Sequence, residues 1–361
     1  GVVAVVGPYN STVAAATAPL AIQHGVPYVV VNATAENFMS EANKYVYRTN
    51  TGSTDGDPMW GLIIDYLNSV RPDDPTDKIA VVYDGAQYML KFPPPPSKNK
   101  ELSYTNSCIS EYIACHIFES AGIPVQETLL GTYTVNGKEK VCVACRDFTS
   151  VGVVLQDFAS LKNQIIDSER NGYGTELADI LKTFEEQQVI DRRELEERFW
   201  DMFVVDALIG NWDRHNGNWG FLYDTQDDSV SLAPVFDCGS SLYPQADDGI
   251  MQKVLDDKNE LNYRVFEIPT SSIMQNGKRL NYHRFLTAGE YAGCNAALRR
   301  VMPRIDMARI DEIVRTTPYI SELQKEFYTT MLKARYDHIL EPSLVMDQRL
   351  EQTQPTMEMK M

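Results

Sequence analysis

Two acidic elements, separated by a strand-like run, constrain the fold of this chain more than any other feature. The first is a loop, residues 209–218, in which Asp213 and Asn218 stand five positions apart after an apolar helical run. The second is the stretch 233–239, in which Asp237 follows a short apolar strand-like run. Asn, Asp and Gly also favour ordinary surface turns, so either element alone could be a turn. Both elements in this order favour a functional site.

The residue types suit phosphoryl transfer. A carboxylate such as Asp213 can orient an acceptor hydroxyl and take its proton, and oxygen ligands such as Asn218 and Asp237 can hold the Mg²⁺ ions that bridge phosphates. The spacing resembles the catalytic and metal-binding loops of protein-kinase-like phosphotransferases. That resemblance implies ATP and Mg²⁺ as cofactors. We interpret the neighbouring His215 as structural, because no Ser or Cys nucleophile accompanies it.

A lysine upstream fits the same chemistry. Asp84 and Gly85 predict a hairpin turn, and Lys91 lies near the end of the apolar run that follows, before four prolines. Glu111 lies in the helix-like run 105–120. Kinases pair a strand lysine with a helix glutamate and with the nucleotide phosphates, so the resemblance assigns these roles here. A lysine whose stem lies along apolar surface is the alternative.

Stretches spread over residues 85–345 resemble the HipA-like kinase family. They are Tyr88–Phe92, Leu102–Ser107, Ser110–Ile113, Gly122–Val125, Thr128–Gly131, Asp213–Asn218, Asn262–Phe266 and Phe327–Tyr336. The resemblance implies a two-lobed α+β kinase fold and ATP-dependent phosphorylation of Ser or Thr on a protein. The Asp213 loop also resembles that of phosphatidylinositol kinases, so the loop by itself does not fix the acceptor.

One departure from the kinase pattern lies upstream of Lys91. Kinases cover the phosphates with a Gly-rich loop just before the lysine strand, whereas residues 71–77 here read Arg-Pro-Asp-Asp-Pro-Thr-Asp. This departure keeps a non-catalytic pseudokinase open as the alternative function. The two intact acidic elements favour the enzyme, and we expect them to converge with Lys91 and Glu111 in one cleft.

Residues 1–84 predict a different fold. Strand-like runs at 2–6, 28–31 and 78–83 alternate with helix-like runs at 13–24 and 58–70. Alternation of this kind indicates a parallel α/β sheet.

Four short stretches of this region resemble the first lobe of periplasmic leucine/isoleucine/valine-binding proteins. They are Gly7–Thr12, Gly25–Tyr28, Ala33–Ala35 and Tyr45–Thr49. In that family the positions matching Ser11, Ala33 and Thr34 hold the ligand, which implies a branched-chain amino acid as a partner. The lobe is truncated, however, and half of a two-lobed protein cannot close on a ligand. A covering or scaffolding role, or an accidental fusion, is therefore the alternative.

Composition excludes several classes of partner. Fifty Asp and Glu residues against 33 Lys and Arg give a net charge of −17, which argues against nucleic acid and anionic membrane surfaces. No apolar run is long enough to span a membrane. The chain starts at Gly1 inside a strand pattern without a basic leader, so we expect no signal peptide and a cytoplasmic protein. We expect the six cysteines, including the lone Cys142-x-x-Cys145, to be buried reduced thiols.

These patterns together predict the organisation of the chain. We expect a truncated α/β lobe at 1–84, a kinase-like N-lobe without its Gly-rich loop at 85–150, a C-lobe at 151–347 and a disordered tail at 348–361. The run 141–148 fits the strand and hinge between the two kinase lobes.

Overall fold

The computed structural model describes residues 78–94, 104–135, 137–166 and 171–353, together with three short strands nearer the N-terminus. The chain divides into two compact units, residues 1–80 and residues 81–361, and each is described by itself. No helix in these described ranges is long and apolar enough to cross a membrane.

Three short parallel strands are what the structure describes of the first unit before residue 78. They are β1 (Val5–Val6), β2 (Tyr28–Val30) and β3 (Val46–Arg48), in the order β1-β2-β3. Both neighbouring pairs run parallel, as expected for the first two strand-like runs. The candidate ligand residues Ser11, Ala33 and Thr34 and the two expected helices lie outside the described residues.

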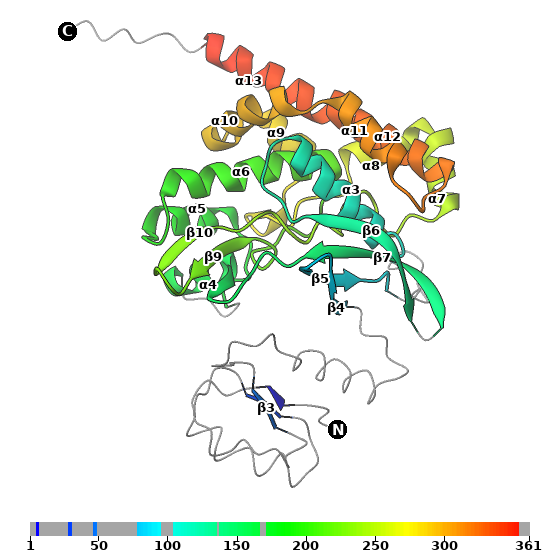
Figure 1. Cartoon of the computed structure of the whole chain (residues 1–361). Coiled ribbons are helices and arrows are strands. Elements are labelled where there is room, and N and C mark those ends of the chain that lie inside the picture. Colours follow the sequence, from blue (N-terminus) through cyan, green and yellow to red (C-terminus); the bar gives the residue numbers. More distant parts are fainter. Residues whose placement is uncertain are drawn as a thin grey trace, which may run out of the picture. The chain divides into compact units, whose positions relative to one another are not determined.

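A four-stranded sheet carries Lys91, with the strand order β4-β5-β7-β6 (Figure 1). Its strands are β4 (Lys78–Tyr83), β5 (Ala86–Lys91), β6 (Thr128–Val135) and β7 (Lys138–Arg146).

The turn between β4 and β5 confirms the predicted hairpin. Asp84 and Gly85 have φ values of 47° and 76°, and two positive φ values in a two-residue turn match the twist of paired strands. This turn also corrects the expectation that residues 78–83 form the third strand of the N-terminal parallel sheet. A turn this short forces the run to pair with the strand that follows it, and β3 is the third strand of the parallel sheet instead.

Helix α3 (Ser107–Ser120) covers the face of the sheet to which Lys91 projects, and it confirms the helix expected at 105–120. Across the strands Lys91 pairs with Val143, and Val143 pairs with Leu130. Residues paired in this way project to one face, and Cys108 of α3 packs on Val143 at that face. The lysine therefore points toward the helix that carries Glu111.

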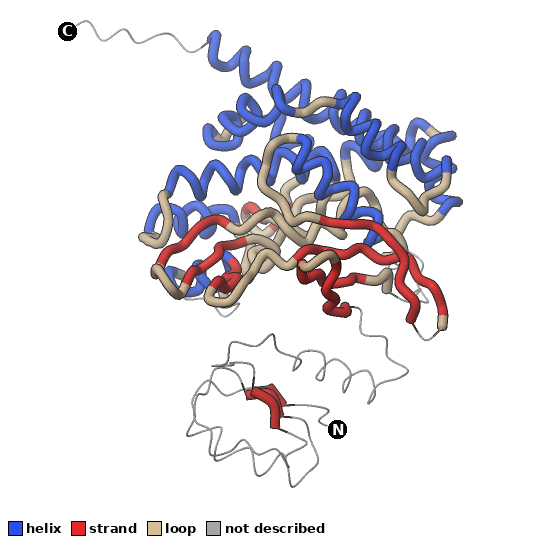
Figure 2. The backbone as a smooth tube through the Cα atoms, viewed as in Figure 1, coloured by secondary structure: helices blue, strands red, loops and turns tan. Residues whose placement is uncertain are grey.

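The rest of the second unit is mainly helical (Figure 2). It contains a second antiparallel sheet, with the order β10-β9-β8, and a small hairpin. Their strands are β8 (Val153–Asp157), β9 (Gly220–Asp224), β10 (Ser229–Leu232), β11 (Met274–Gln275) and β12 (Lys278–Arg279).

The helices of this part surround one large hydrophobic core. They are α4 (Phe158–Ile165), α5 (Leu177–Glu186), α6 (Arg192–Ile209), α7 (Asp248–Asp256), α8 (Lys258–Phe266), α9 (Tyr282–Ala288), α10 (Ala292–Val301), the 3-10 helix η2 (Met302–Arg304), α11 (Met307–Thr316), α12 (Glu322–Arg335), the π-helix η3 (Tyr336–Leu340) and α13 (Glu341–Thr353).

Helix α6 positions the first acidic element. Its N-terminus is capped by Asp191, whose side chain accepts a hydrogen bond from the backbone N–H of Glu194. Its last turns, including Val204, Leu208 and Ile209, are fully buried, so the end of the helix is fixed in the core. Gly210 then takes a left-handed conformation with φ 65°, which ends the helix and releases the chain into the loop.

Two further expectations need correction. Helix α13 extends to Thr353, so residues 348–353 of the tail predicted to be disordered at 348–361 are helical, and residues 354–361 lie outside the described residues. Asp347, just before this stretch, pairs with Arg299 of α10 at 2.6 Å and holds the helix to the rest of the second unit. The strand expected before Asp237 is reduced to one bridge, in which Val235 pairs with Val125.

Candidate active site

Lys91 forms the centre of a cluster of charges that joins three distant parts of the chain. Its amine Nζ lies 3.3 Å from Glu111 Oε2 on α3 and 3.1 Å from Asp237 Oδ1. Glu111 is buried, whereas the Asp237 side chain is 45% exposed. The structure thus brings three of the five predicted kinase residues into direct contact.

The Lys91 amine is held in its charged form. Burial alone would lower its pKa, but the carboxylates of Glu111 and Asp237 outweigh that effect and raise the pKa above the usual lysine value. A fixed cation whose neighbour Asp237 faces solvent can bind a phosphate oxygen.

The segment around Asp237 is tied to helix α3. The backbone N–H of Cys238 donates to Glu111 Oε1 at 3.0 Å, so the two carboxylate oxygens of Glu111 hold the Asp237 segment and Lys91 respectively. A Cβ at Gly239 would lie 3.0 Å from Glu111 Oε2, so a larger residue here would push the Glu111 carboxylate by a few tenths of an ångström. Asp237 itself has φ 56°, an uncommon conformation for a residue other than glycine.

The other two predicted residues lie together on the loop after α6. The side-chain Nδ2 of Asn218 donates to the backbone carbonyl of Asp213 at 2.8 Å, which closes the loop on itself. The bond uses the amide nitrogen, so the amide oxygen is the atom that could bind a metal. His215 accepts a hydrogen bond from the backbone N–H of Gly217 at its Nδ1, 3.0 Å away, which agrees with a role in shaping the loop.

Asp213 is close enough to Asp237 for their charges to interact. Burial raises the pKa of Asp213 above the usual aspartate value; the nearby His215 opposes this, and the negative charge of Asp237 adds to it. A half-buried aspartate with a raised pKa is a stronger base than an ordinary one.

Arg214 joins the two acidic elements, and the sequence reasoning did not single it out. Its Nη1 donates to the carbonyl of Asn218 at 2.9 Å and to the carbonyl of Phe236 at 2.5 Å. The same guanidinium donates to both carboxylate oxygens of Asp206, at 3.0 and 3.2 Å. The one available signal was Asp206 itself, because an acidic residue within an apolar helix needs a buried cation.

All six cysteines are buried and free of disulfides, and their burial was expected. In the described ranges, no group of three or more His, Cys, Asp or Glu side chains lies close enough to hold a metal. A metal at this site would therefore depend on Asn218 and Asp237 together with non-protein ligands such as phosphate oxygens and water.

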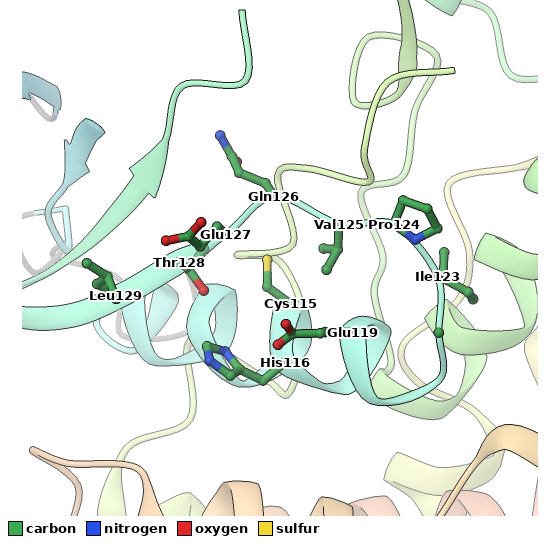
Figure 3. Close-up of a pocket in the computed structure, with 11 residues that line it drawn as sticks. Cys115, His116, Glu119, Ile123, Pro124, Val125, Gln126, Glu127, Thr128 and Leu129 are labelled. Atoms are coloured by element: carbon green, nitrogen blue, oxygen red, sulfur yellow. The ribbon is translucent and has the colours of Figure 1, made fainter. Parts of the chain in front are cut away.

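A separate hollow of about 610 Å³ lies beside α3 (Figure 3). Its lining residues are Cys115, His116, Glu119 and the segment 122–129. None of the five predicted kinase residues lines it, so this hollow is not the cluster around Lys91.

Known proteins resemble this chain over most of its length. The chain matches the family described as HipA-like C-terminal domain over residues 75–316. It is 51% identical over 266 residues to the serine/threonine-protein kinase CtkA of Helicobacter pylori (strain J99), which covers 73% of this chain and 81% of that protein. A crystal structure of a Helicobacter pylori proinflammatory kinase CtkA matches with a TM-score of 0.71 and 46% identity, covering 76% of this chain and 95% of that chain. The chain therefore belongs to the HipA-like family, and its second unit has the mixed α/β kinase-like fold of that family.

Proposed function

We propose that this chain is an ATP- and Mg²⁺-dependent protein kinase that phosphorylates Ser or Thr. The observation that carries the proposal is the contact of Lys91 with both Glu111 and Asp237. A lysine held by a buried glutamate beside a solvent-facing aspartate suits a phosphate chain and its metal ion. The relationship to a serine/threonine-protein kinase supports the same activity.

Each residue has a distinct role in this proposal. Asp213 orients the acceptor hydroxyl and accepts its proton, and its raised pKa suits that task. Asn218 and Asp237 hold Mg²⁺, which when bound neutralises the charge of the phosphates. Lys91, fixed by Glu111, contacts the phosphate oxygens. The run 141–148 serves as the hinge that adenine meets.

The domain boundaries are part of the proposal. A kinase-like N-lobe covers residues 85–150 and a C-lobe covers 151–347. The residues before β4 act as a partial binding-protein-like lobe, rather than the whole of 1–84, because β4 pairs with β5 of the N-lobe sheet. Ser11, Ala33 and Thr34 are the candidate contacts of this lobe for a branched-chain amino acid.

A non-catalytic binding module is the second candidate function. The observation that favours it is the two-residue turn at Asp84 and Gly85, because β4 meets the lysine strand β5 there without a Gly-rich loop. Without that loop the nucleotide phosphates would be open to water. For the same reason we expect phosphate transfer to be slow if the chain is an enzyme.

Phosphate transfer from ATP tests the proposal. The purified chain should bind ATP in calorimetry at millimolar Mg²⁺ and transfer phosphate to itself or to a generic protein. Asp213→Ala should lower the rate by about 10²–10⁴ while ATP binding persists, because the hydroxyl loses its base. Asp237→Ala should instead weaken Mg²⁺-dependent ATP binding, because a metal ligand is lost.

The control is Asp228→Ala, which removes an aspartate from the turn between β9 and β10 and should change neither property. Failure of the wild-type chain to bind ATP would refute the kinase proposal. Binding of leucine or valine in that case would support the binding module.

A further inference from the structure

Arg279 lies beside the proposed base, on the small hairpin formed by β11 and β12. Its Nη1 donates to the backbone carbonyl of Trp212 at 3.2 Å, and Trp212 directly precedes Asp213 in the loop. The Arg279 charge is also near enough to lower the pKa values of Asp213 and Tyr104, against the stronger effect of burial at both residues. An exposed cation therefore lies next to the residue proposed as the base.

The hairpin that carries Arg279 is anchored to the body of the second unit. The carboxylate of Glu176 accepts hydrogen bonds from the backbone N–H groups of Asn276 and, at 3.3 Å, of Gly277. Met274 forms a bridge with Glu176, and its N–H donates to the carbonyl of Thr175 at 2.9 Å. These contacts fix the position of Arg279 before any acceptor arrives, which lowers the entropy cost of binding.

The guanidinium has donors to spare. Within the described ranges the Arg279 guanidinium makes no ion pair, and the bond to the Trp212 carbonyl is its one hydrogen bond. An arginine has five N–H donors in a planar fork that matches a carboxylate. In a chain of net charge −17, the Arg279 guanidinium forms no ion pair with a described carboxylate, although Asp213 is nearby, so its other N–H groups are available to a ligand.

Aromatic surface adjoins the cation. The rings of Tyr104 and Trp212 meet edge to face, with centroids 5.8 Å apart, and both residues are partly exposed. Three segments distant in the sequence, represented by Tyr104, Trp212 and Arg279, thus meet next to Asp213. Aromatic faces and an arginine fork together suit an extended peptide that carries an acidic side chain.

We propose that Arg279 binds an acidic side chain of the acceptor protein, so that the chain prefers Ser or Thr residues flanked by Asp or Glu. The inference rests on the proposed kinase function and names the substrate class of the same site. Arg279 contacts the acceptor in this scheme and takes no part in the chemistry.

Matched peptides test the inference. The full chain is incubated with ATP, Mg²⁺ and pairs of Ser peptides, and kcat/KM is measured for each peptide. The two peptides of a pair differ only in carrying Asp or Asn at one position near the Ser. The best Asp peptide should exceed its Asn counterpart in kcat/KM by about tenfold at low salt, as a charge-assisted hydrogen bond allows. Arg279→Ala should reduce the ratio of the two kcat/KM values, Asp peptide over Asn peptide, to about one, whatever its effect on the rate that the two peptides share.

Charge reversal separates recognition from a structural role. Arg279→Glu should reverse the preference, so that a peptide with Lys at the same position becomes better than the Asp peptide. Lys278→Ala is the matched control on the same strand; adjacent residues of a strand project to opposite sides, so the Asp preference should persist.

Three outcomes would overturn the inference. Equal rates for the Asp and Asn peptides with the wild-type chain would exclude an acidic preference. An equal loss for both peptides in Arg279→Ala would indicate a structural or phosphate contact instead. If no peptide is phosphorylated and ATP does not bind, the kinase proposal fails and the inference fails with it. If phosphate is transferred without a preference for Asp over Asn, the inference alone is refuted.

Discussion

Arg214 is the residue on which the geometry of the candidate site most depends. It is buried beneath the loop, and its guanidinium contacts the segments that carry both proposed metal ligands. Burial alone would lower its pKa, but the Asp206 carboxylate outweighs that effect and raises the pKa, so the guanidinium stays charged. Arg214 therefore ties the segment of Asn218 to the segment of Asp237 directly.

Arg214→Met should destabilise the fold by about 3–5 kcal/mol, because it leaves the buried Asp206 carboxylate without a cation. Urea unfolding measures the loss. The double variant Arg214→Met with Asp206→Leu should recover much of the stability, because no buried charge is left unpaired. It should not recover Mg²⁺-dependent ATP binding, because the hydrogen bonds of Arg214 to Asn218 and Phe236 are still missing. Arg193→Ala, which removes an exposed arginine from α6, is the control and should change little. Full ATP binding in the double variant would contradict the proposal that Arg214 holds the two metal-ligand segments together.

The raised pKa of Asp213 predicts the pH dependence of catalysis. A base must be unprotonated, so kcat should fall as the pH drops through the pKa of Asp213. Since burial and Asp237 raise that pKa, the fall should occur at a higher pH than for an ordinary aspartate. Asp237→Asn removes one of the charges that raise it, so residual activity in that variant should persist to lower pH. An unchanged profile in Asp237→Asn would show that the two carboxylates do not interact.

At the scale of elements, the contact between β8 and β9 holds the loop of Asp213 and Asn218 in place from its C-terminal side. Gly220 begins β9, two residues after Asn218, and it pairs with Asp157 at the end of β8. A Cβ at Gly220 would lie 2.1 Å from the backbone oxygen of Gln156, so the strands can approach only because this residue is a glycine.

Gly220→Ala should therefore push β9 away from β8 and destabilise the fold by about 1–3 kcal/mol, the usual range for overpacking. It should also slow phosphate transfer, because Asn218 moves with the strand. Gly131→Ala in β6 is the matched control, since a Cβ there meets no atom within 4 Å. Chemical denaturation of both variants compares their free energies of unfolding. Equal values would show that the close approach of Gly220 to Gln156 does not affect stability.

At the scale of the whole molecule, the second unit contains a core of its own. Among the residues that the structure describes, the large hydrophobic cluster runs from Ile109 to Leu340, all within the second unit. The family match begins at residue 75, just before β4.

A fragment comprising residues 75–361 should consequently fold by itself. Its thermal unfolding midpoint should equal that of the kinase-like unit in the full chain, because the cluster and β4 are retained. Any binding of leucine or valine by the full chain should be lost in the fragment, which calorimetry can measure. A fragment that fails to fold would mean that residues 1–74 stabilise the second unit.

Patterns within short stretches determined much of this protein from the sequence alone. The two-residue turn at Asp84 and Gly85, the helix that carries Glu111 and the loop from Asp213 to Asn218 all follow from local propensity and spacing, which act over a few residues. The family was recognisable for the same reason, because its motifs are local.

The tertiary structure decided which of these local pieces meet. Lys91 contacts Asp237 across 146 positions of sequence, and Arg214 reaches Phe236 from a different loop. The sheet in which residues 78–83 pair, and the extension of α13 to Thr353, also depended on distant partners. Such contacts depend on how sheets and helices pack, and packing energies come from residues far apart in the chain, which no short pattern contains.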